Sequence, residues 1–327
     1  MMKRKNLVGL IGMVFIAGII AGVVSPAPAA DFPNQNIRII VGAKPGGGMD
    51  LYARAVGRYM EKYLPEGVHV VVENRAGAGG QVGASMVYNS EPDGYTLNFP
   101  HMPGLYFPQM FLQKTKYDMT KVIWICLIGR DPRVIAISEK SKFKTLEDMK
   151  KADDAKFAIV GYTGEAGILL ANAKLGIKAT YITGHKNSKE AALAAVRGDA
   201  DAVGFSYWSI RSFIKKGQLK PVAVLGYEER IGEIPDVPTL SELGQPEVNS
   251  ILGSFRTICA PPGVPPERVK YLRDIFWKTL NDKELQEWAK KAKRPVNPMN
   301  GEAAEKLMKK MMSEYPKYKD ILGKYIK

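Results

Sequence analysis

Apolar residues occur along this chain in short β-branched runs that alternate with segments of helical spacing. The first run, Ile37–Val41, is followed by a glycine loop and then by a helical pattern between residues 51 and 60. The order repeats, with strands expected at residues 68–72 and 95–99 and a helix at residues 81–89. Strands that alternate with helices in this way predict an α/β sheet that is largely parallel.

A second α/β unit is expected from residue 131 onward. Its strands are expected at residues 134–138, 157–160, 178–182, 202–205 and 220–225, and its helices at residues 167–175, 189–197 and 208–216. One more strand follows at Ser254–Ala260, and amphipathic helical stretches then occupy residues 267–280, 283–292 and 301–321. Because helices that end a chain need a sheet to cover, we expect them to return to the first unit.

These elements predict two lobes, each a mainly parallel sheet flanked by helices, with a ligand cleft between them. Residues 30–130 and 254–327 form lobe 1 in this prediction, and residues 131–253 form lobe 2. The chain would cross between the lobes near residues 127–130 and 253–258, where a hinge is expected. Cys126 and Cys259 lie beside these crossings, and their number and spacing leave a disulfide open.

The N-terminal segment has the pattern of a secretory signal peptide. Lys3, Arg4 and Lys5 precede an uncharged run over residues 6–24, and small residues with two prolines follow at residues 25–30. A permanent anchor helix is the alternative, since the run approaches the ~20 residues that span a bilayer. The glycines and the proline-rich exit favour cleavage, so we predict that residues 1–29 are removed and that the protein works outside the cytoplasm.

Composition and charge narrow the partners. Hydrophobic residues make up 46% of the chain, which is typical of a globular protein. The formal net charge is +14, but the lysines are dispersed and no aromatic-basic or zinc-finger pattern occurs, so no nucleic-acid partner is expected. A solvated cationic surface and weak steering of an anionic ligand both remain open. His69, His101 and His185 form no cluster at ligand spacing, so neither a metal nor another cofactor is predicted.

Two glycine-rich loops carry the candidate chemistry. The loop at residues 44–50 joins a strand to a helix, whose unpaired N–H groups suit a carboxylate or a phosphate, and Asp50 is expected to cap that helix. The loop at residues 75–80 repeats the arrangement, and parallel strands would bring both loops to one edge. Neither loop matches a P-loop or a dinucleotide fingerprint, and tight turns without a ligand remain an alternative.

No nucleophile constellation appears, so the chain is not expected to be an enzyme. His101 follows the third expected strand and His185 lies in an expected loop. A hydrogen-bonded structural role is the simpler interpretation of a single histidine, although loop positions favour contact with a ligand.

With both units in view, the chain resembles the periplasmic solute receptors of tripartite tricarboxylate transporters. The resemblance covers nearly all of the chain after the predicted signal peptide. It is carried by an ordered series of motifs at residues 32–33, 37–50, 71–84, 92–97, 197–201, 235–244 and 260–265. It implies a monomeric two-lobed binding protein of the periplasm that closes like a Venus flytrap on a small organic acid. Such a receptor delivers its ligand to membrane permease subunits and uses no cofactor.

The resemblance also implies where the acid is held. The first glycine loop would bind one ligand carboxylate through backbone groups and bridging waters, which agrees with the argument from the helix terminus. The candidate ligand-binding residues on the first lobe are Ala43, Lys44, Gly46, Gly47, Gly48, Met49, Asp50, Gly79 and His101. Those on the second lobe are Thr163, Gly164, Glu165, His185, Lys186, Ser206 and Tyr207, and core packing is the alternative for Tyr207.

The chain departs from the family pattern at several of these positions. Lys44 stands where proline is common, while Gly48 and Met49 replace small hydroxyl residues. Glu165 replaces a serine, and an acid there would repel a dianion unless a cation intervenes. These departures favour a bulkier, aromatic or amine-bearing acid over the short dicarboxylates. Two alternatives stay open, a carboxylate receptor for a membrane sensor and a secreted nucleotide-dependent enzyme.

Overall fold

The β-branched runs become the central strands of a first sheet. The computed structural model describes residues 32–111 and 114–325, so the predicted signal peptide lies outside the described residues. This sheet has the order β2-β1-β3-β11-β4, with β5 paired to the other edge of β11. Its strands are β1 (Ile37–Val41), β2 (Val70–Asn74), β3 (Thr96–Phe99), β4 (His101–Met102), β5 (Ile123–Asp131) and β11 (Ser254–Ala260).

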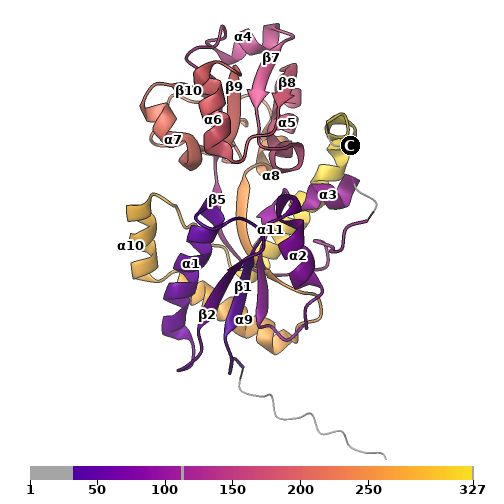
Figure 1. Cartoon of the computed structure of the whole chain (residues 1–327), viewed down its shortest axis with the longest axis vertical. Helices are drawn as coiled ribbons and strands as arrows, with labels where there is room; N and C mark the ends of the chain where they lie inside the picture. The colour runs from indigo at the N-terminus through magenta and orange to yellow at the C-terminus, as the bar shows by residue number, and fades with distance from the viewer. Residues whose placement is uncertain (1–31, 112–113, 326–327) are drawn as a thin grey trace, which may run out of the picture. The chain divides into compact units, whose positions relative to one another are not determined.

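A second sheet is built by the middle of the chain, in the order β10-β6-β9-β7-β8. Its strands are β6 (Arg133–Ser138), β7 (Ala155–Ala158), β8 (Ala179–Ile182), β9 (Ala202–Ser206) and β10 (Leu219–Leu225). Figure 1 shows the helices that accompany it, which are α4 (Leu146–Lys151), α5 (Tyr162–Leu175), α6 (Ser188–Arg197), α7 (Tyr207–Lys215) and α8 (Pro246–Ile251).

The helices around the first sheet come from both ends of the described chain (Figure 1). The early ones are α1 (Gly48–Met60), α2 (Gln81–Tyr88) and α3 (Tyr106–Phe111), with short 3-10 turns at Glu61–Tyr63 and Ala78–Gly80. The late ones are α9 (Pro266–Leu280), α10 (Lys283–Ala292) and α11 (Gly301–Glu314), followed by a 3-10 turn at Tyr315–Tyr318 and α12 (Lys319–Leu322). Pro316 lies in that turn, which explains why the predicted helix over residues 301–321 is interrupted.

The sheets are mixed, and this corrects the prediction of mainly parallel sheets. β1 pairs in parallel with β2 and β3, and β7 pairs in parallel with β8 and β9, as alternation of strands and helices requires. The strands that lead from one sheet to the other run against their neighbours, so β11 pairs antiparallel with β3, β4 and β5. In the second sheet β6 is antiparallel to both β9 and β10.

Two neighbouring strands lead toward the second sheet. β5 and β11 pair antiparallel, with Arg130 opposite Phe255 and Asp131 opposite Ser254, and Pro132 alone separates β5 from β6. The Arg130 guanidinium donates to the carbonyl oxygens of Asn249, Ser250 and Leu252, so it caps the C-terminal end of α8. This junction coincides with the segments predicted as the hinge; the lobe boundaries at residues 130 and 254 stay a prediction.

The C-terminal helices contact elements of both sheets. α9 and α11 pack on β5 of the first sheet, as expected for helices that cover it. α12 instead contacts α5, and the Tyr181 and Tyr325 rings meet edge to face at 5.2 Å. Buried side chains of α11, such as Met308 and Met311, share one apolar cluster with Phe157 and Leu169 from the second sheet and its helix α5.

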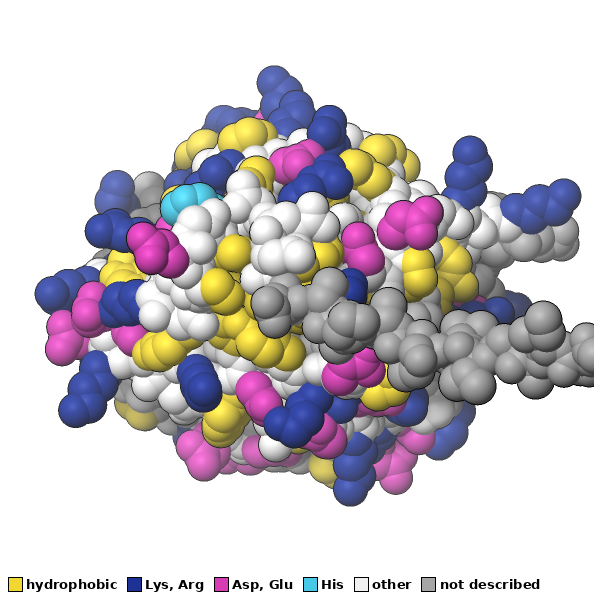
Figure 2. Space-filling model, turned by 90° about the horizontal axis from the view of Figure 1, so that it is seen from below, with side chains coloured by type: hydrophobic (Ala, Val, Ile, Leu, Met, Phe, Trp, Pro, Cys, Tyr) yellow, Lys and Arg dark blue, Asp and Glu magenta, His cyan; other side chains and the backbone are white. Residues whose placement is uncertain are grey.

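Charged side chains are spread over the surface. On the face drawn in Figure 2, lysines and arginines are interspersed with acidic side chains and do not merge into one basic patch. Within residues 32–111 and 114–325 no helix is both long enough and apolar enough to cross a bilayer.

The two cysteines are predicted to be free thiols in solution. Cys126 lies opposite Ile258 in the pairing of β5 with β11, so Cys259, the next residue along, faces the other side of the sheet. Burial also raises the pKa of both thiols, which keeps them protonated and unreactive. Thiol titration without reductant should find two reactive groups in denaturant and none in the native protein. Fewer than two in denaturant would contradict this arrangement.

Candidate functional site

The first glycine loop ends at the N-terminus of α1. Gly46 has a φ of 79°, a conformation that glycine adopts freely, and α1 begins at Gly48. Asp50 does not supply the predicted cap, because the N-cap position is Gly47 and has no capping side chain. Asp50 instead lies in the first turn, where it accepts a hydrogen bond from the Gly46 amide at 2.9 Å and pairs with Arg54. The loop is thus held from inside, with Lys44, Pro45, Gly46 and Gly47 exposed.

Burial raises the pKa of Asp50, but the hydrogen bonds from Arg54 and from the Gly46 amide outweigh it and lower the pKa overall. Ala43 accepts a hydrogen bond from the Asn74 side chain at 3.0 Å, and Met49 is half-buried beside Gly48. The residues of this loop that the sequence predicts to bind a ligand therefore lie together at the N-terminus of α1. Their main-chain groups are at the helix terminus, and the Asp50 side chain points back into the loop.

Two arginines lie against the start of α1. A Cβ built at Gly48 would lie 3.5 Å from Nη1 of Arg294 and 3.9 Å from Nη1 of Arg256. The Arg256 guanidinium lies over the Tyr52 ring at 4.3 Å, and that of Arg294 lies 5.9 Å from the same ring. The Tyr52 hydroxyl donates to the carbonyl oxygen of Pro295 at 3.0 Å, which fixes the segment that carries Arg294. Two cationic side chains, those of Arg256 and Arg294, thus lie against the first turn of α1.

Arg256 is paired with a buried acid. It lies on β11 and forms an ion pair with Asp131, the last residue of β5, whose side chain is 1% exposed. The Ser206 hydroxyl, at the end of β9, donates to the same Asp131 carboxylate at 3.1 Å. Burial lowers the pKa of Arg256, but the attraction of Asp131 and the contact with Tyr52 outweigh it and raise the pKa overall. Arg256 is therefore a permanent cation beside Gly48.

A second buried pair joins Arg133 to Glu165. Arg133 begins β6 and lies opposite Ser206 in the pairing with β9. Its guanidinium forms an ion pair with Glu165 in the first turn of α5 and donates to the carbonyl oxygen of Gly204 at 2.6 Å. Burial lowers the pKa of Arg133 to about 10, so it stays charged at neutral pH. The sequence predicts that Glu165 repels an anion unless a cation lies beside it. Arg133 is that cation.

His101 lies close enough to both arginines to be affected by their charges. It is opposite Arg256 in the pairing of β4 with β11. Burial lowers its pKa to about 4, and the charges of Arg133 and Arg256 act in the same direction. His101 is therefore neutral at pH 7, when it can both donate and accept a hydrogen bond.

Several polar atoms in this cluster have no hydrogen-bond partner among the described residues. They are Oδ1 of Asp131, Nε of Arg133 and Nε of Arg256, all buried. His185 Nε2 and Trp208 Nε1 are in the same condition, and their segments follow β8 and β9, two strands that flank β7 in the second sheet. Buried polar groups are nearly always paired, so partners from outside the chain are expected here.

The other predicted site residues are placed as follows. Thr163 and Gly164 lie in the first turn of α5, next to Glu165. Gly79 is exposed in the second glycine loop, and a Cβ on Gly42 would lie 2.8 Å from the Cα of its neighbour Gly80, so this loop packs backbone to backbone against the end of β1. Lys186 is exposed, and its amide donates to Glu190.

Tyr207 is in the core. Its side chain is 1% exposed, and its hydroxyl donates to Glu233 at 3.0 Å. Burial and that hydrogen bond raise its pKa to about 12. The geometry therefore favours core packing, the alternative weighed from the sequence, over ligand contact.

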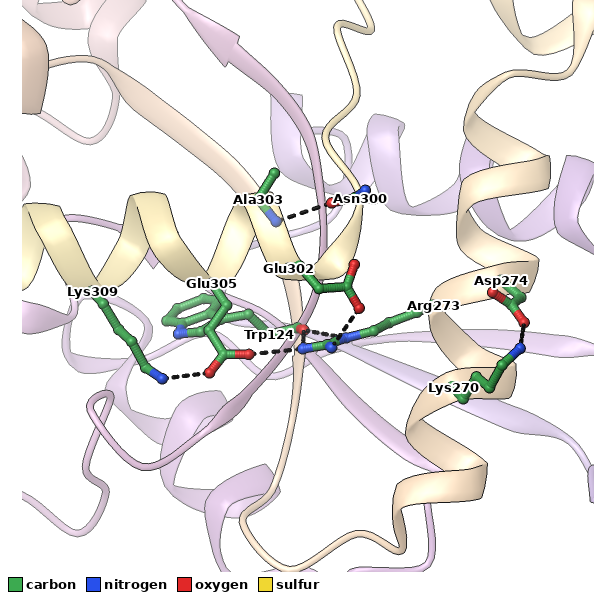
Figure 3. A network of polar contacts seen from close by, with 9 residues as sticks. All are labelled: Trp124, Lys270, Arg273, Asp274, Asn300, Glu302, Ala303, Glu305 and Lys309. Atoms are coloured by element: carbon green, nitrogen blue, oxygen red, sulfur yellow. Dashed lines mark hydrogen bonds and ion pairs between the residues drawn. The ribbon is translucent and has the colours of Figure 1, made fainter.

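A separate pocket of about 560 Å³ lies between α9 and the start of α11. Figure 3 shows the contacts of its two cationic side chains. Arg273 donates hydrogen bonds to the carboxylates of Glu302 and Glu305 and to the Trp124 carbonyl oxygen, and Lys270 donates to the carboxylate of Asp274. Because these charges are paired with each other, the pocket offers no free cation for an acid. The cluster at Gly48, whose buried polar atoms lack partners, is the stronger candidate site.

Sequence reasoning missed the arginines. Arg133, Arg256 and Arg294 were not singled out, nor was Asp131 as a site residue. A signal was present, because Arg256 and Arg133 are the charged residues of the apolar strands SFRTICA and RVIAIS. A charge in such a strand needs a buried partner or a ligand.

Comparison with known proteins bears on the class of site. Residues 52–325 match the family model described as the tripartite tricarboxylate transporter family receptor. The chain belongs to this receptor family. Protein BugT of Bordetella pertussis is 30% identical over 298 residues, which cover 88% of each chain. The family is one of periplasmic transport receptors and not of enzymes.

Solved structures confirm the predicted fold. A periplasmic transporter is 28% identical with a TM-score of 0.72, covering 89% of this chain and 99% of that one. A TctC solute-binding protein from Polaromonas is 26% identical with a TM-score of 0.73, covering 90% and 99%. The chain therefore has the α/β fold of periplasmic binding proteins, in which two sheets correspond to two lobes.

In the described ranges no group of three or more His, Cys, Asp or Glu is placed to hold a metal.

The depressed pKa of His101 predicts a pH dependence of stability. The unfolded chain takes up a proton near pH 6.5 and the folded chain only near pH 4, so the free energy of unfolding falls as pH drops through this window. The loss is up to about 3 kcal/mol, and the contribution is fully present above pH 6.5. Denaturant unfolding at about pH 7 and about pH 4.5 should show a smaller pH effect in His101→Gln than in wild type. Equal pH effects would rule out this role.

Proposed function

We propose that this protein is a periplasmic solute-binding protein that captures a small organic carboxylate and delivers it to the permease of a tripartite tricarboxylate-type transporter. The observation that carries the proposal is the placement of the Arg256 and Arg294 guanidinium groups at Gly48, the first residue of α1. Unpaired amides of a helix terminus and two guanidinium groups together form an anion site.

The energetics favour a carboxylate at this position. The N-terminus of α1 carries a partial positive charge, which is worth ~0.3–1 kcal/mol to a nearby anion. Hydrogen bonds from a guanidinium to a carboxylate are charge-assisted, and each contributes ~1.5–3 kcal/mol. Arg256 is already buried and fixed over Tyr52, so little side-chain freedom would be lost on binding.

Structures of the same fold support an organic acid as ligand. MatC of Rhodopseudomonas palustris, 23% identical with a TM-score of 0.70, was solved with bound malate. A second protein of that organism, 18% identical with a TM-score of 0.72, was solved with adipate. In our proposal the same scaffold holds a carboxylate here, with the Gly48 end of the site in the first lobe.

The second lobe would hold the other end of the ligand. The residues proposed for this role are Thr163, Gly164, His185, Lys186 and Ser206, together with Trp208, whose indole N–H is buried without a partner. The lobes in this proposal are residues 30–130 with 254–327 and residues 131–253, and they close about the paired strands β5 and β11. A monomer that releases its ligand to permease subunits completes the proposal.

A carboxylate placed at Gly48 should block the site. Gly48→Asp would put an acid beside Arg256 and Arg294, where it would occupy the position proposed for the ligand. An acidic residue in the first helical turn is favourable, so the fold should be kept. In a thermal-shift and calorimetry screen of mono-, di- and aromatic carboxylates, wild type should be stabilised by at least one acid, and Gly48→Asp should lose about a hundredfold or more in affinity.

Gly48→Ala is the matched control. Its methyl group would be in ordinary van der Waals contact with Arg294 at 3.5 Å and would bring no charge, so binding should stay within about tenfold of wild type. Equal binding by all three proteins would remove the acid from this position.

Delivery to a permease is tested in cells. A strain that lacks the gene should lose uptake of the acid that binds, and wild type but not Gly48→Asp should restore it. Uptake that continues unchanged without the gene would favour the sensor alternative, in which binding serves a signal and not transport.

A further inference from the structure

The candidate site contains more charge than one carboxylate needs. Three arginines, Arg133, Arg256 and Arg294, meet two acids, Asp131 and Glu165, through contacts that join them into one cluster. Ser206 links the two pairs, since it bonds Asp131 and lies opposite Arg133 in the sheet. The formal charges of these five groups leave one positive charge in excess.

Two of the arginines are already neutralised from within. The Asp131 and Glu165 side chains are 1% and 9% exposed, so each acid is held beside its arginine with little water to screen it. Each of these ion pairs therefore carries no net charge, and each contains a carboxylate that would lie near a bound anion.

Arg294 supplies the excess charge. Among the described residues it has no carboxylate partner; its guanidinium lies beside Gly48 and 5.9 Å from the Tyr52 ring. The N-terminus of α1 adds a partial positive charge at the same place. The net attraction for an anion is thus concentrated at one end of the cluster.

Neighbouring buried charges do not alter this balance, and the Lys44 and Lys186 side chains are exposed, so water and salt screen their charges. The Arg130 guanidinium is bonded to carbonyl oxygens at the end of α8, and Asp50 is paired with Arg54. His101 is neutral at pH 7 because burial depresses its pKa.

We propose that the site selects a small carboxylate that carries one net negative charge and discriminates against dianions of the same size. The inference rests on the proposed function and adds a ligand class to it. A first carboxylate is matched by Arg294 and the terminus of α1. A second one, farther along the cluster, would lie near Asp131 or Glu165, whose arginines are already paired, and like charges in a poorly hydrated site repel strongly.

Two kinds of ligand meet this requirement, and they can be told apart. One has a neutral polar group at its far end, which would meet the unpartnered Nε of Arg133 or the indole N–H of Trp208. The other has two carboxylates and an amine. Its ammonium group would donate a hydrogen bond to the unpartnered Oδ1 of Asp131. Both carry a single net negative charge.

The first test compares ligands of one size. Calorimetry at pH 7 on the purified protein would use glutarate, its monoamide and glutamate, the corresponding sets built on succinate and adipate, and terephthalate with its monoamide. On each scaffold that binds, a singly charged member should bind about tenfold or more tightly than the dianion. A dianion that binds as well or better would overturn the inference while leaving the proposed function intact. If no carboxylate of any charge binds, the proposed function itself fails.

The second test changes the charge of the site. Glu165→Gln leaves Arg133 without its acid and adds one net positive charge, so the preference should shift toward the dianion by about tenfold or more. Arg133→Gln/Glu165→Gln removes both members of the pair and should restore the wild-type preference. Thermal melting checks that each variant folds, and Asp131→Asn serves as a second single variant with the same expected direction. An unchanged preference in folded single variants would refute the role of these acids.

Discussion

The ion pair between Arg256 and Asp131 joins the parts of the candidate site. Arg256 lies on β11 and Asp131 closes β5, and the register of these antiparallel strands brings the two side chains together. Ser206, at the end of β9, bonds the same carboxylate, so the second sheet is tied to this contact as well. A charge this far from water is tolerated only beside its counter-charge, so neither residue can be exchanged alone without a buried charge left over.

The contact also explains how distant segments reach one place. Tyr52 on α1 lies under Arg256, and its hydroxyl holds Pro295, so that Arg294 from the segment after α10 meets Gly48. Gly129 allows this close approach, because a Cβ there would lie 3.1 Å from the Pro295 carbonyl oxygen. The cluster is therefore assembled by packing around β5 and β11, the two strands that lead from the first sheet toward the second.

The sequence predicted the parts of this structure that depend on local pattern. Ile37–Val41 and Ser254–Ala260 formed the expected strands, and the glycine loop before α1 lies where strand–loop–helix order places it. The antiparallel pairing of β11 and the partners of Glu165 and Asp131 depend on residues far apart in sequence. Arg133 is 32 residues from Glu165, and Arg256 is 125 residues from Asp131, so no spacing rule connects them. An arginine in an apolar strand signals only that a partner must exist.

Recognition of the ligand therefore has two parts, one set by local sequence pattern and one set by contacts between residues far apart in the sequence. The amides at the start of α1 come with the fold, since any strand, glycine turn and helix in this order presents them toward an anion. The side chains that surround them do not come with the fold, and in our proposal the balance of Asp131 and Glu165 against the three arginines sets how much charge an anion meets beyond the first carboxylate. Membership of the receptor family therefore argues for an acid as ligand, whereas the charge of that acid has to be argued from the buried pairs of this chain.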